Sequence, residues 1–288
     1  MLGLGASLTS ASSLDEINQF LSFDGTDDKA ERSLSEADRT ILSGTDDDTD
    51  DLPNNISFSM WIKPTWDAGS GDLVNSILFF HIGGSQDVHE VIRAYYSIET
   101  SGGTNKNEIW VEARSSSPSN KAELQYAVLG SNNSITSTGT GTSDAAMWDS
   151  GNTGSANADG FVHLYFTRAG DAWSIFWNGQ ELTSNTHTDN TLEVSDEDYD
   201  LIRFGARPPL SASGSDYYCQ YGIKHFAIYN RSQTGTVPSD LYNSGVMADP
   251  RGLTSTDYLV AYYPFNENGN DLVNSLNLTV TGATFVNV

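Results

Sequence analysis

The acidic run GTDDDTDDL is the strongest candidate for metal chemistry in the sequence. Asp46, Asp48 and Asp50 have the one-three-five spacing of a calcium-binding loop, and carboxylate oxygens are the ligands that Ca²⁺ and Mg²⁺ prefer. Asp51 stands where such a loop needs glycine, however, and Ser57 stands where it needs a bidentate glutamate. The run is therefore either a divalent-cation site, with Ca²⁺ as the cofactor, or a solvated acidic loop.

Two tryptophans stand in polar, turn-rich stretches, where an indole ring is available to a ligand. Trp66 lies in PTWDAGSGD and Trp148 lies in AAMWDSGN. A flat ring in such a loop can stack on the face of a sugar, which makes both residues candidate carbohydrate-binding residues. The alternative is that the two rings cap the open ends of a β-sandwich, and the sequence leaves both interpretations open.

Catalytic patterns are missing from the sequence. One arrangement for cleaving glycosidic bonds places carboxylates along a strand as E-x-D-x-x-E, so that the acid and the nucleophile face one cleft, and no such triplet occurs. The segment HEVIR, 89 to 93, lacks the second histidine of a zinc pair. His163 lies in a strand-like run and is interpreted as a core histidine. We therefore predict no catalytic residue and a protein that is not an enzyme.

The charge balance limits the partners that the protein can bind. The chain has 38 acidic and 14 basic side chains and a net charge of −24, and such a surface repels phosphate backbones and anionic lipid headgroups. We therefore expect neither nucleic-acid nor membrane binding. Cys219 is the single cysteine, which fits folding in a reducing cytosol, and the N-terminus lacks the basic and apolar regions of a secretory signal.

The N-terminal stretch MLGLGASLTSASSLDEINQ differs in composition from the rest of the chain. It mixes Gly, Ser and small apolar residues without a helical stripe, so it cannot bury enough surface to fold alone. We interpret residues 1–19 as an attachment arm and residues 20–288 as one domain. Small residues allow close backbone approach, and several large apolar side chains are available to fill a partner's groove: Leu2, Leu4, Leu8, Leu14 and Ile17.

The stretch GDAWSIFWNGQEL, 170 to 182, shows the kind of element that must position these residues. Trp173, Ile175 and Trp177 fall on one face of a β-strand. Asn178-Gly179 then supplies the two positive-φ positions of a type I′ hairpin turn. Together with FVHLYFTR just upstream, the pattern predicts a three-stranded antiparallel meander whose paired tryptophans lie in the core.

Similar short strands recur along the chain, separated by clusters of Gly, Ser, Asn, Asp and Pro. We expect them at residues 20–25, 56–64, 76–83, 90–99, 108–115, 123–130, 201–206, 221–230, 258–265 and 276–286. Trp61 and Trp110 stand in such strands and are expected in the core. Many short strands with this punctuation predict an all-β sandwich or jelly roll of two antiparallel sheets.

The remaining segments are expected to be short or irregular. The one helix that we expect lies near 238–244, with Pro238 in its first turn and Gly245 just after its end. Residues 29–55 and 131–160 are long and polar, and we expect both to be surface loops.

The order of these segments resembles that of laminin-G-like, concanavalin A-like jelly-roll domains. FLSFDGTDD followed by ISFSMWIKP is similar to the opening of such domains, and FVHLYFTRAGDAWSIFWNGQEL is similar to their central meander. LIRFGA, YGIKHFAIYNRSQTGTVPSDLYN and LVAYYPFNENGNDLVNS are similar to their late strands, their closing short helix and a segment that flanks the core strands. The resemblance covers most of residues 20–288 and implies a concanavalin A-like jelly-roll sandwich.

Two departures from this family concern function. Family members often carry acidic residues in the strand that here reads GIKHFAIY, where this chain has Lys224 and His225. The segment AYYPF often precedes the SFDG strand but here comes near the C-terminus, which fits one sheet if the two termini are neighbours. No family ligand site is therefore carried over to this chain.

The function that we expect is that of a non-catalytic surface protein of a virus particle, of the decoration or fibre type. Phage and virus particles use jelly rolls of this kind, and the opening MLGLGASLTS is similar to that of marine phage structural proteins. The expected partners are other virion proteins, bound through the arm in an oligomeric assembly, and cell-surface glycans. The expected location is the virion surface or, alternatively, the extracellular space. A soluble carbohydrate-binding lectin is the alternative function, ahead of a polysaccharide-cleaving enzyme.

Overall fold

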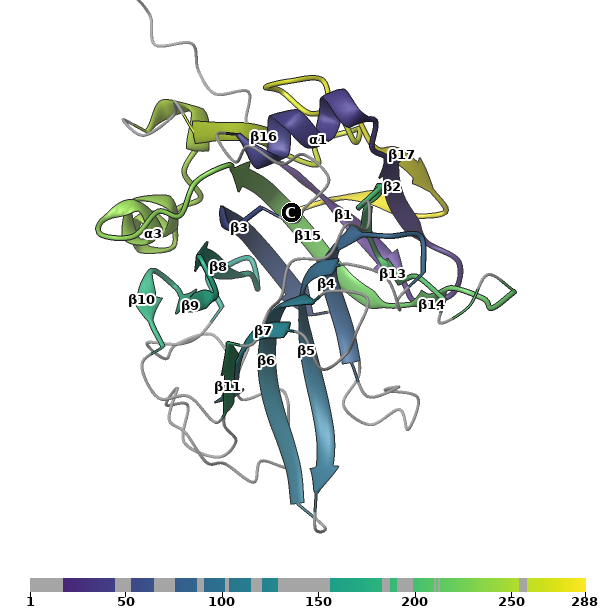
Figure 1. Ribbon diagram of the computed structural model, residues 1–288. Helices are drawn as coiled ribbons and strands as arrows, with labels where there is room; N and C mark the ends of the chain where they lie inside the picture. Colours follow the sequence, from purple (N-terminus) through teal and green to yellow (C-terminus); the bar gives the residue numbers. More distant parts are fainter. Residues whose placement is uncertain are drawn as a thin grey trace, which may run out of the picture.

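The computed structural model shows two antiparallel β-sheets that lie face to face, with short helices at their margins (Figure 1). The structure describes residues 18–44, 53–64, 76–86, 91–101, 104–114, 121–128, 156–182, 187–190, 199–209, 211, 213–253 and 258–288. This architecture confirms the all-β jelly-roll sandwich that the sequence predicts.

The first sheet, sheet A, has the strand order β10-β9-β8-β3-β15-β1-β18, and β16 also pairs with β15. Its strands are β1 (Gln19–Asp24), β3 (Asn55–Pro64), β8 (Val162–Ala169), β9 (Ala172–Trp177), β10 (Gln180–Glu181), β15 (Gln220–Tyr229), β16 (Leu259–Tyr263) and β18 (Thr284–Asn287).

The second sheet, sheet B, has the strand order β11-β7-β6-β5-β4-β12-β2-β17. Its strands are β2 (Lys29–Ser33), β4 (Ser76–Gly83), β5 (Val91–Ser101), β6 (Thr104–Arg114), β7 (Lys121–Val128), β11 (His187–Asn190), β12 (Leu201–Phe204) and β17 (Thr279–Thr281). The long β5–β6 hairpin extends beyond the rest of the sandwich (Figure 1). A separate ribbon joins β13 (Ala206–Arg207) and β14 (Tyr217–Tyr218).

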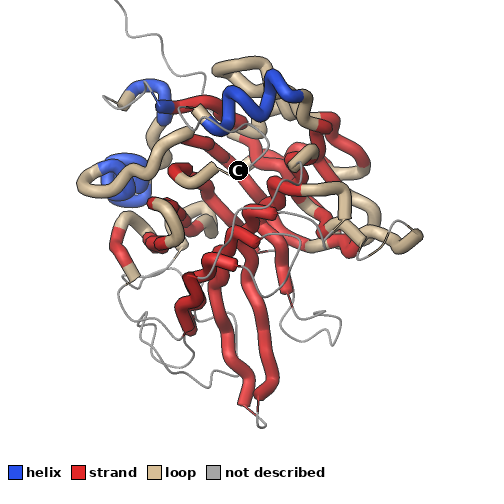
Figure 2. Tube along the Cα trace, in the orientation of Figure 1, coloured by secondary structure: helices blue, strands red, loops and turns tan. Residues whose placement is uncertain are grey.

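The core lies between the two sheets because alternate residues of their strands are apolar and point inward. Phe58 and Met60 of β3 and Ile109 and Val111 of β6 all belong to this buried cluster. The sheets form the body of the molecule in Figure 2, and the helices lie along its margin. Residues of the opposite parity face outward. The expectation that Trp110 belongs to the core is therefore wrong, because it stands between two inward-facing residues and is only half-buried.

The meander formed by β8, β9 and β10 folds as predicted. Asn178 and Gly179 have φ values of 48° and 77°, and the turn places Gln180 opposite Trp177. Trp173 and Trp177 are 8% and 1% exposed and lie in the cluster between the sheets. Trp173 Nε1 also donates a hydrogen bond to the carbonyl of Ala122 in β7, over 3.0 Å. The paired tryptophans therefore join sheet A to sheet B.

The first and last described strands are neighbours in sheet A. β1 pairs with β15 on one side and with β18 on the other, and Val288 N donates to the carbonyl of Asn18 over 2.7 Å. β16, which contains most of the AYYPF segment, also pairs with β15. One sheet thus accommodates the late position of AYYPF.

Helix α1 (Glu36–Ser43) corrects the expectation of a surface loop across residues 29–55. Strand β2 also lies within that range. Ser35 caps the helix: its side chain accepts a hydrogen bond from Asp38 N, and the Asp38 carboxylate accepts one from Ser35 N. The stretch is polar, yet Leu42 is fully buried. A capping box and one anchoring leucine thus suffice to form a short helix here.

Helix α3 (Val237–Tyr242) confirms the short helix expected near 238–244, with Pro238 in its first turn. Its C-cap is Asn243, at φ 44°, rather than Gly245. Gly245 instead ends the 3₁₀ turn η1 (Asn243–Gly245), and a second 3₁₀ turn, η2, spans Pro250–Gly252. Among the described residues, the structure contains no helix that is long and apolar enough to cross a membrane.

Candidate functional site

The outer face of sheet B carries large charged and aromatic side chains. Ala94 of β5 and Val111 of β6 point into the core, so the residues on either side of them in sequence point outward. The strand register sets these outward residues in two cross-strand pairs, Arg93 opposite Glu112 and Tyr95 opposite Trp110. Cross-strand neighbours on one face are close enough to interact. We call these four residues, together with Lys121 and Glu123 of β7, the β5–β7 face.

Ion pairs hold the charged groups of the β5–β7 face in place. Arg93 Nε donates to Glu112 Oε1 over 2.6 Å, and the two residues are 8% and 4% exposed. Glu112 lies opposite Glu123 of β7, whose carboxylate pairs with Lys121 Nζ at 2.7 Å. Each carboxylate therefore has a cation beside it, which offsets the repulsion between the two. The result is a set of donors and acceptors with fixed positions.

Tyr95 and Trp110 form a stacked aromatic pair beside these ion pairs. Their ring centroids are 5.6 Å apart, their planes differ by 14°, and both residues are half-buried. Loss of solvent contact is the main cause that raises the pKa of the Tyr95 hydroxyl far above its usual range, so the ring stays neutral at physiological pH. Trp110 Nε1 is buried and has no hydrogen-bond partner in the described part of the chain. A buried donor of this kind is uncommon in folded proteins.

The polar row continues from β5 across β4 and β12. His81 lies opposite Arg93 on one side and opposite Arg203 on the other. Arg203 pairs with Glu31 at 2.7 Å and with Asp216 at 2.8 Å. His81 Nε2 donates to the carbonyl of Gly84 over 3.0 Å, and burial lowers the pKa of the His81 imidazole to about 3. The imidazole is therefore neutral at neutral pH and contributes no charge to the row.

This arrangement has the two features that a carbohydrate site needs. Aromatic rings cover the apolar face of a sugar, and charged side chains fixed by their own ion pairs bind its hydroxyl groups. Both features occur within the β5–β7 face.

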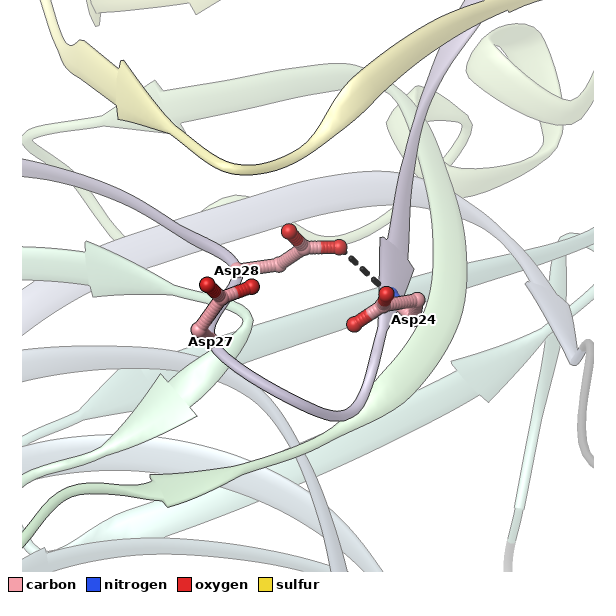
Figure 3. A group of neighbouring side chains, drawn as sticks. All are labelled: Asp24, Asp27 and Asp28. Carbon is pink, nitrogen blue, oxygen red and sulfur yellow. Dashed lines mark hydrogen bonds between the residues drawn. The ribbon is translucent and has the colours of Figure 1, made fainter.

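A second group of carboxylates lies at the turn between β1 and β2. Asp24, Asp27 and Asp28 each place one carboxylate oxygen within 4.8 Å of the others (Figure 3). Asp28 is 5% exposed, and its carboxylate accepts a hydrogen bond from Asp24 N over 2.6 Å. Burial raises the pKa of Asp28. The buried carboxylate thus stabilises the backbone of the turn, and these three residues are different from the acidic run of the sequence prediction.

The residues proposed from sequence as site residues lie outside the described residues. They are the metal candidates Asp46, Asp48 and Asp50, the carbohydrate-binding candidates Trp66 and Trp148, and the arm residues Leu2, Leu4, Leu8, Leu14 and Ile17. These assignments stay predictions.

The β5–β7 face is not predicted from the sequence, because the face combines residues from separate segments. EVIRAYYSIE and EIWVEARS both alternate apolar residues with charged or aromatic ones, and this alternation was the available signal. The segments do not contain the register that brings Arg93 to Glu112 and Tyr95 to Trp110, because pairing depends on the turns and on the whole sheet.

Comparison with known proteins finds similar solved structures but no family. No family model matches the chain, and none of the curated proteins matches it. Among solved structures, a heptameric SAP-like pentraxin from Limulus polyphemus is similar, with 11% identity, a TM-score of 0.49 and coverage of 94% of this chain and 96% of that chain. The CBM40 of the Ruminococcus gnavus IT-sialidase, bound to α2,3 sialyllactose, has 9% identity, a TM-score of 0.45 and coverage of 81% and 99%.

A Trypanosoma rangeli sialidase is also similar over part of its length, with 12% identity and a TM-score of 0.40. The match covers 80% of this chain but 28% of the sialidase. At these identities and TM-scores, none of the similar structures identifies a ligand or a reaction for this chain.

Proposed function

We propose that the protein is a non-catalytic carbohydrate-binding protein whose ligand lies on the β5–β7 face. The observation that carries this proposal is the stacked, half-buried pair of Tyr95 and Trp110 beside a fixed ion pair. Carbohydrate sites combine an aromatic surface with a few well-placed polar groups, and this face provides both.

The polar groups supply donors and acceptors on the same side of the rings. Glu112 and Glu123 offer carboxylate oxygens, and Arg93 offers guanidinium N–H groups. Trp110 Nε1 is buried and has no partner in the described part of the chain, so the part of Trp110 that a ligand can contact is its ring.

The ion pairs made by the carboxylates support binding rather than cleavage. Glu112 and Glu123 lie opposite one another and are of the residue type that glycosidases use, but they pair with Arg93 and Lys121. Cleavage requires a carboxylic acid that donates a proton to the leaving group. The purified protein should therefore release no reducing sugar from β-glucans, alginates or sulfated algal polysaccharides. Turnover that disappears in a Glu112→Gln variant would contradict this.

The finer proposal is that this face belongs to a surface protein of a virus particle, attached through the N-terminal arm. Its support is the sequence: apolar side chains among Gly and Ser in residues 1–17, on a chain of net charge −24. Because β1 begins at Gln19, deletion of residues 1–17 should leave the melting temperature nearly unchanged while it abolishes incorporation into a larger assembly. Normal assembly of the truncated protein would show that attachment lies elsewhere.

A glycan array tests the carbohydrate proposal directly. The wild-type protein should bind a defined set of glycans, and Trp110→Ala and Tyr95→Ala should each lose that binding. Tyr217→Ala is the matched control, because Tyr217 is an aromatic residue that is 49% exposed and lies on β14, outside the β5–β7 face. Retained binding in both test variants, with the variants folded by circular dichroism, would place any glycan site elsewhere.

A further inference from the structure

The outer face of sheet A carries a pair of lysines, on the opposite side of the sandwich from the β5–β7 face. Lys63 of β3 lies opposite Gly222 of β15, and Lys224 is two residues further along β15. Residues two apart on a strand share a face, so both lysine side chains project from the same side of the sheet. Trp61, which lies opposite Lys224, is on that side too and packs in a small cluster outside the main core.

Both ammonium groups lie over the same aromatic ring. The Nζ atoms of Lys63 and Lys224 are 5.4 Å and 5.8 Å from the centre of the Phe161 ring. Lys63 Nζ is also 5.3 Å from the centre of the Phe20 ring. Gly160 leaves room for the Lys63 side chain, because a Cβ there would lie 3.2 Å from Lys63 Cε. The fold thus places two positive charges close to one buried ring.

Neither ammonium group has a carboxylate partner. Within the described ranges, no Asp or Glu oxygen lies within 4.0 Å of either Nζ, and neither Nζ donates a hydrogen bond to the protein. Asp159 acts on Lys224 only through a longer-range electrostatic interaction. The chain has 38 acidic residues to 14 basic ones, so a shortage of carboxylates does not explain the lack of a counter-ion.

Lys224 is the more constrained of the two lysines. It is 4% exposed, and its pKa is lowered mainly by loss of solvent contact and further by the charge of Lys63, against an opposing effect of Asp159. Burying a charged group without a partner is unfavourable, and a like charge beside it adds to the cost. An anion between the two groups would remove both penalties.

From this geometry we infer that Lys63 and Lys224 form a binding site for one oxyanion, a sulfate, phosphate or carboxylate group held by both ammonium groups beside Phe161. Lysine ammonium groups bind such groups as compact point charges with several donors. The oxyanion is either a free inorganic ion or the charged group of an acidic sugar. The site shares no residue with the β5–β7 face, so each can fail without the other.

Thermal unfolding in sulfate and in phosphate tests the site, with ionic strength held constant by sodium chloride. Wild type is compared with Lys63→Met, Lys224→Met and the matched control Lys29→Met, since Lys29 already pairs with Glu31 at 2.9 Å. Wild type and Lys29→Met should show a saturable rise in melting temperature. Lys63→Met and Lys224→Met should each bind the anion at least about tenfold more weakly, because each removes one of two charge-assisted contacts.

Sulfate also stabilises proteins in general, because it is excluded from their surfaces. That effect does not saturate and is common to all variants. Equal rises in all four proteins would therefore overturn the proposal.

Stability without the anion gives a second, independent result. Lys224→Met should melt at a higher temperature than wild type in chloride buffer, because the change removes a partly desolvated charge that has no carboxylate partner within 4.0 Å and keeps the apolar stem. A melting temperature well below that of wild type would mean that the ammonium group stabilises the fold, and would overturn the proposal.

The source of the oxyanion is tested with a sulfated oligosaccharide and its unsulfated parent. The Trp110→Ala variant is used, because it lacks the aromatic pair of the β5–β7 face. Binding of the sulfated form alone, lost in the Trp110→Ala, Lys224→Met double variant, assigns the site to an acidic sugar. Binding of inorganic ions alone assigns it to a free ion, and binding of neither overturns the proposal.

Discussion

At the residue scale, the face on which a tryptophan stands decides its role. Trp173 and Trp177 of β9 point between the sheets and are almost fully buried. Trp110 of β6 points outward, is half-buried and stacks on Tyr95. The same residue type therefore supplies core packing on one strand and an accessible ring on another.

Replacing one tryptophan of each kind separates these roles. Trp173→Ala should lower the free energy of unfolding by about 3–5 kcal/mol, because it removes a large buried side chain and the hydrogen bond to Ala122. Trp110→Ala should cost about 1 kcal/mol, the usual size of an aromatic pair contact. Urea unfolding measures both changes. Similar losses in the two variants would contradict the assignment of Trp110 to the outer face.

The sequence predicts whether a tryptophan is buried only where a local pattern decides which way its side chain points. Alternation within GDAWSIFWNGQEL was enough to place Trp173 and Trp177 in the core, because the hairpin turn fixes the strand locally. Trp110 needed the further knowledge of which face of β6 meets the other sheet. That face depends on packing against sheet A, whose strands are distant in sequence from β6, and no local pattern in the sequence predicts it.

At the element scale, the turn between β9 and β10 makes a testable contact with helix α3. Gly179 has φ 77°, and a Cβ there would lie 3.0 Å from Ser239 Cα and 3.2 Å from Tyr242 Cβ. Gly170, in the turn between β8 and β9, has φ 59° but open space around it. The two glycines therefore share a backbone conformation and differ in packing.

Alanine substitutions should distinguish backbone conformation from packing. Gly170→Ala should cost about 1–2 kcal/mol, the penalty of a side chain in the left-handed region. Gly179→Ala should cost at least about 1 kcal/mol more, because the added methyl group meets α3 and the surrounding structure must shift. The free energy of unfolding in urea is the measurement. Equal costs would show that α3 does not pack on this turn.

The elements that the sequence predicted are those with strong local signals. The meander, the strands flanked by turn residues and helix α3 with Pro238 all have them. Helix α1 was missed because its capping box uses Asp38 in place of the usual glutamate or glutamine, within a stretch that is polar overall. Its formation depends on burial of Leu42, which is a tertiary contact rather than a local preference.

At the scale of the whole molecule, three buried histidines couple folding to pH. Burial lowers the pKa of His81, His163 and His225 from 6.5 to about 3 in the folded protein. As the pH falls below 6.5, these imidazoles become protonated in the unfolded chain but stay neutral in the folded protein. The stability that these groups contribute is therefore complete above pH 6.5 and is lost as the pH falls toward 3.

The free energy of unfolding should thus decrease between pH 6.5 and pH 4.5, by up to about 1.4 kcal/mol per pH unit for each histidine. Urea unfolding at fixed ionic strength across this range provides the test. Asp38 and Asp249, whose pKa values are lowered, titrate below this window. The raised pKa of Asp28 acts in the opposite direction to the histidines, because the folded protein binds that proton more readily than the unfolded chain. Stability that is flat over the window would show that the imidazoles are accessible to solvent in the folded protein.

The two-sheet architecture was predictable because many short strands with frequent turns have few other stable arrangements. The β5–β7 face was not, although β5, β6 and β7 are neighbours in sheet B in the same order as in the chain, because the register between the strands and the side that meets sheet A cannot be read from each segment alone. The lysine pair on sheet A was not predictable either, because it depends on the pairing of β3 with β15, two strands that are far apart in the chain.

Carbohydrate binding to the β5–β7 face can be followed through the indole N–H signals of the six tryptophans. A ¹⁵N-labelled sample is titrated with the best-binding glycan from the array, and each signal is assigned by single Trp→Phe variants. We expect the Trp110 Nε1–H signal to shift with saturation while those of Trp61, Trp173 and Trp177 stay in place. A saturable shift of Trp66 or Trp148 with Trp110 unchanged would contradict it.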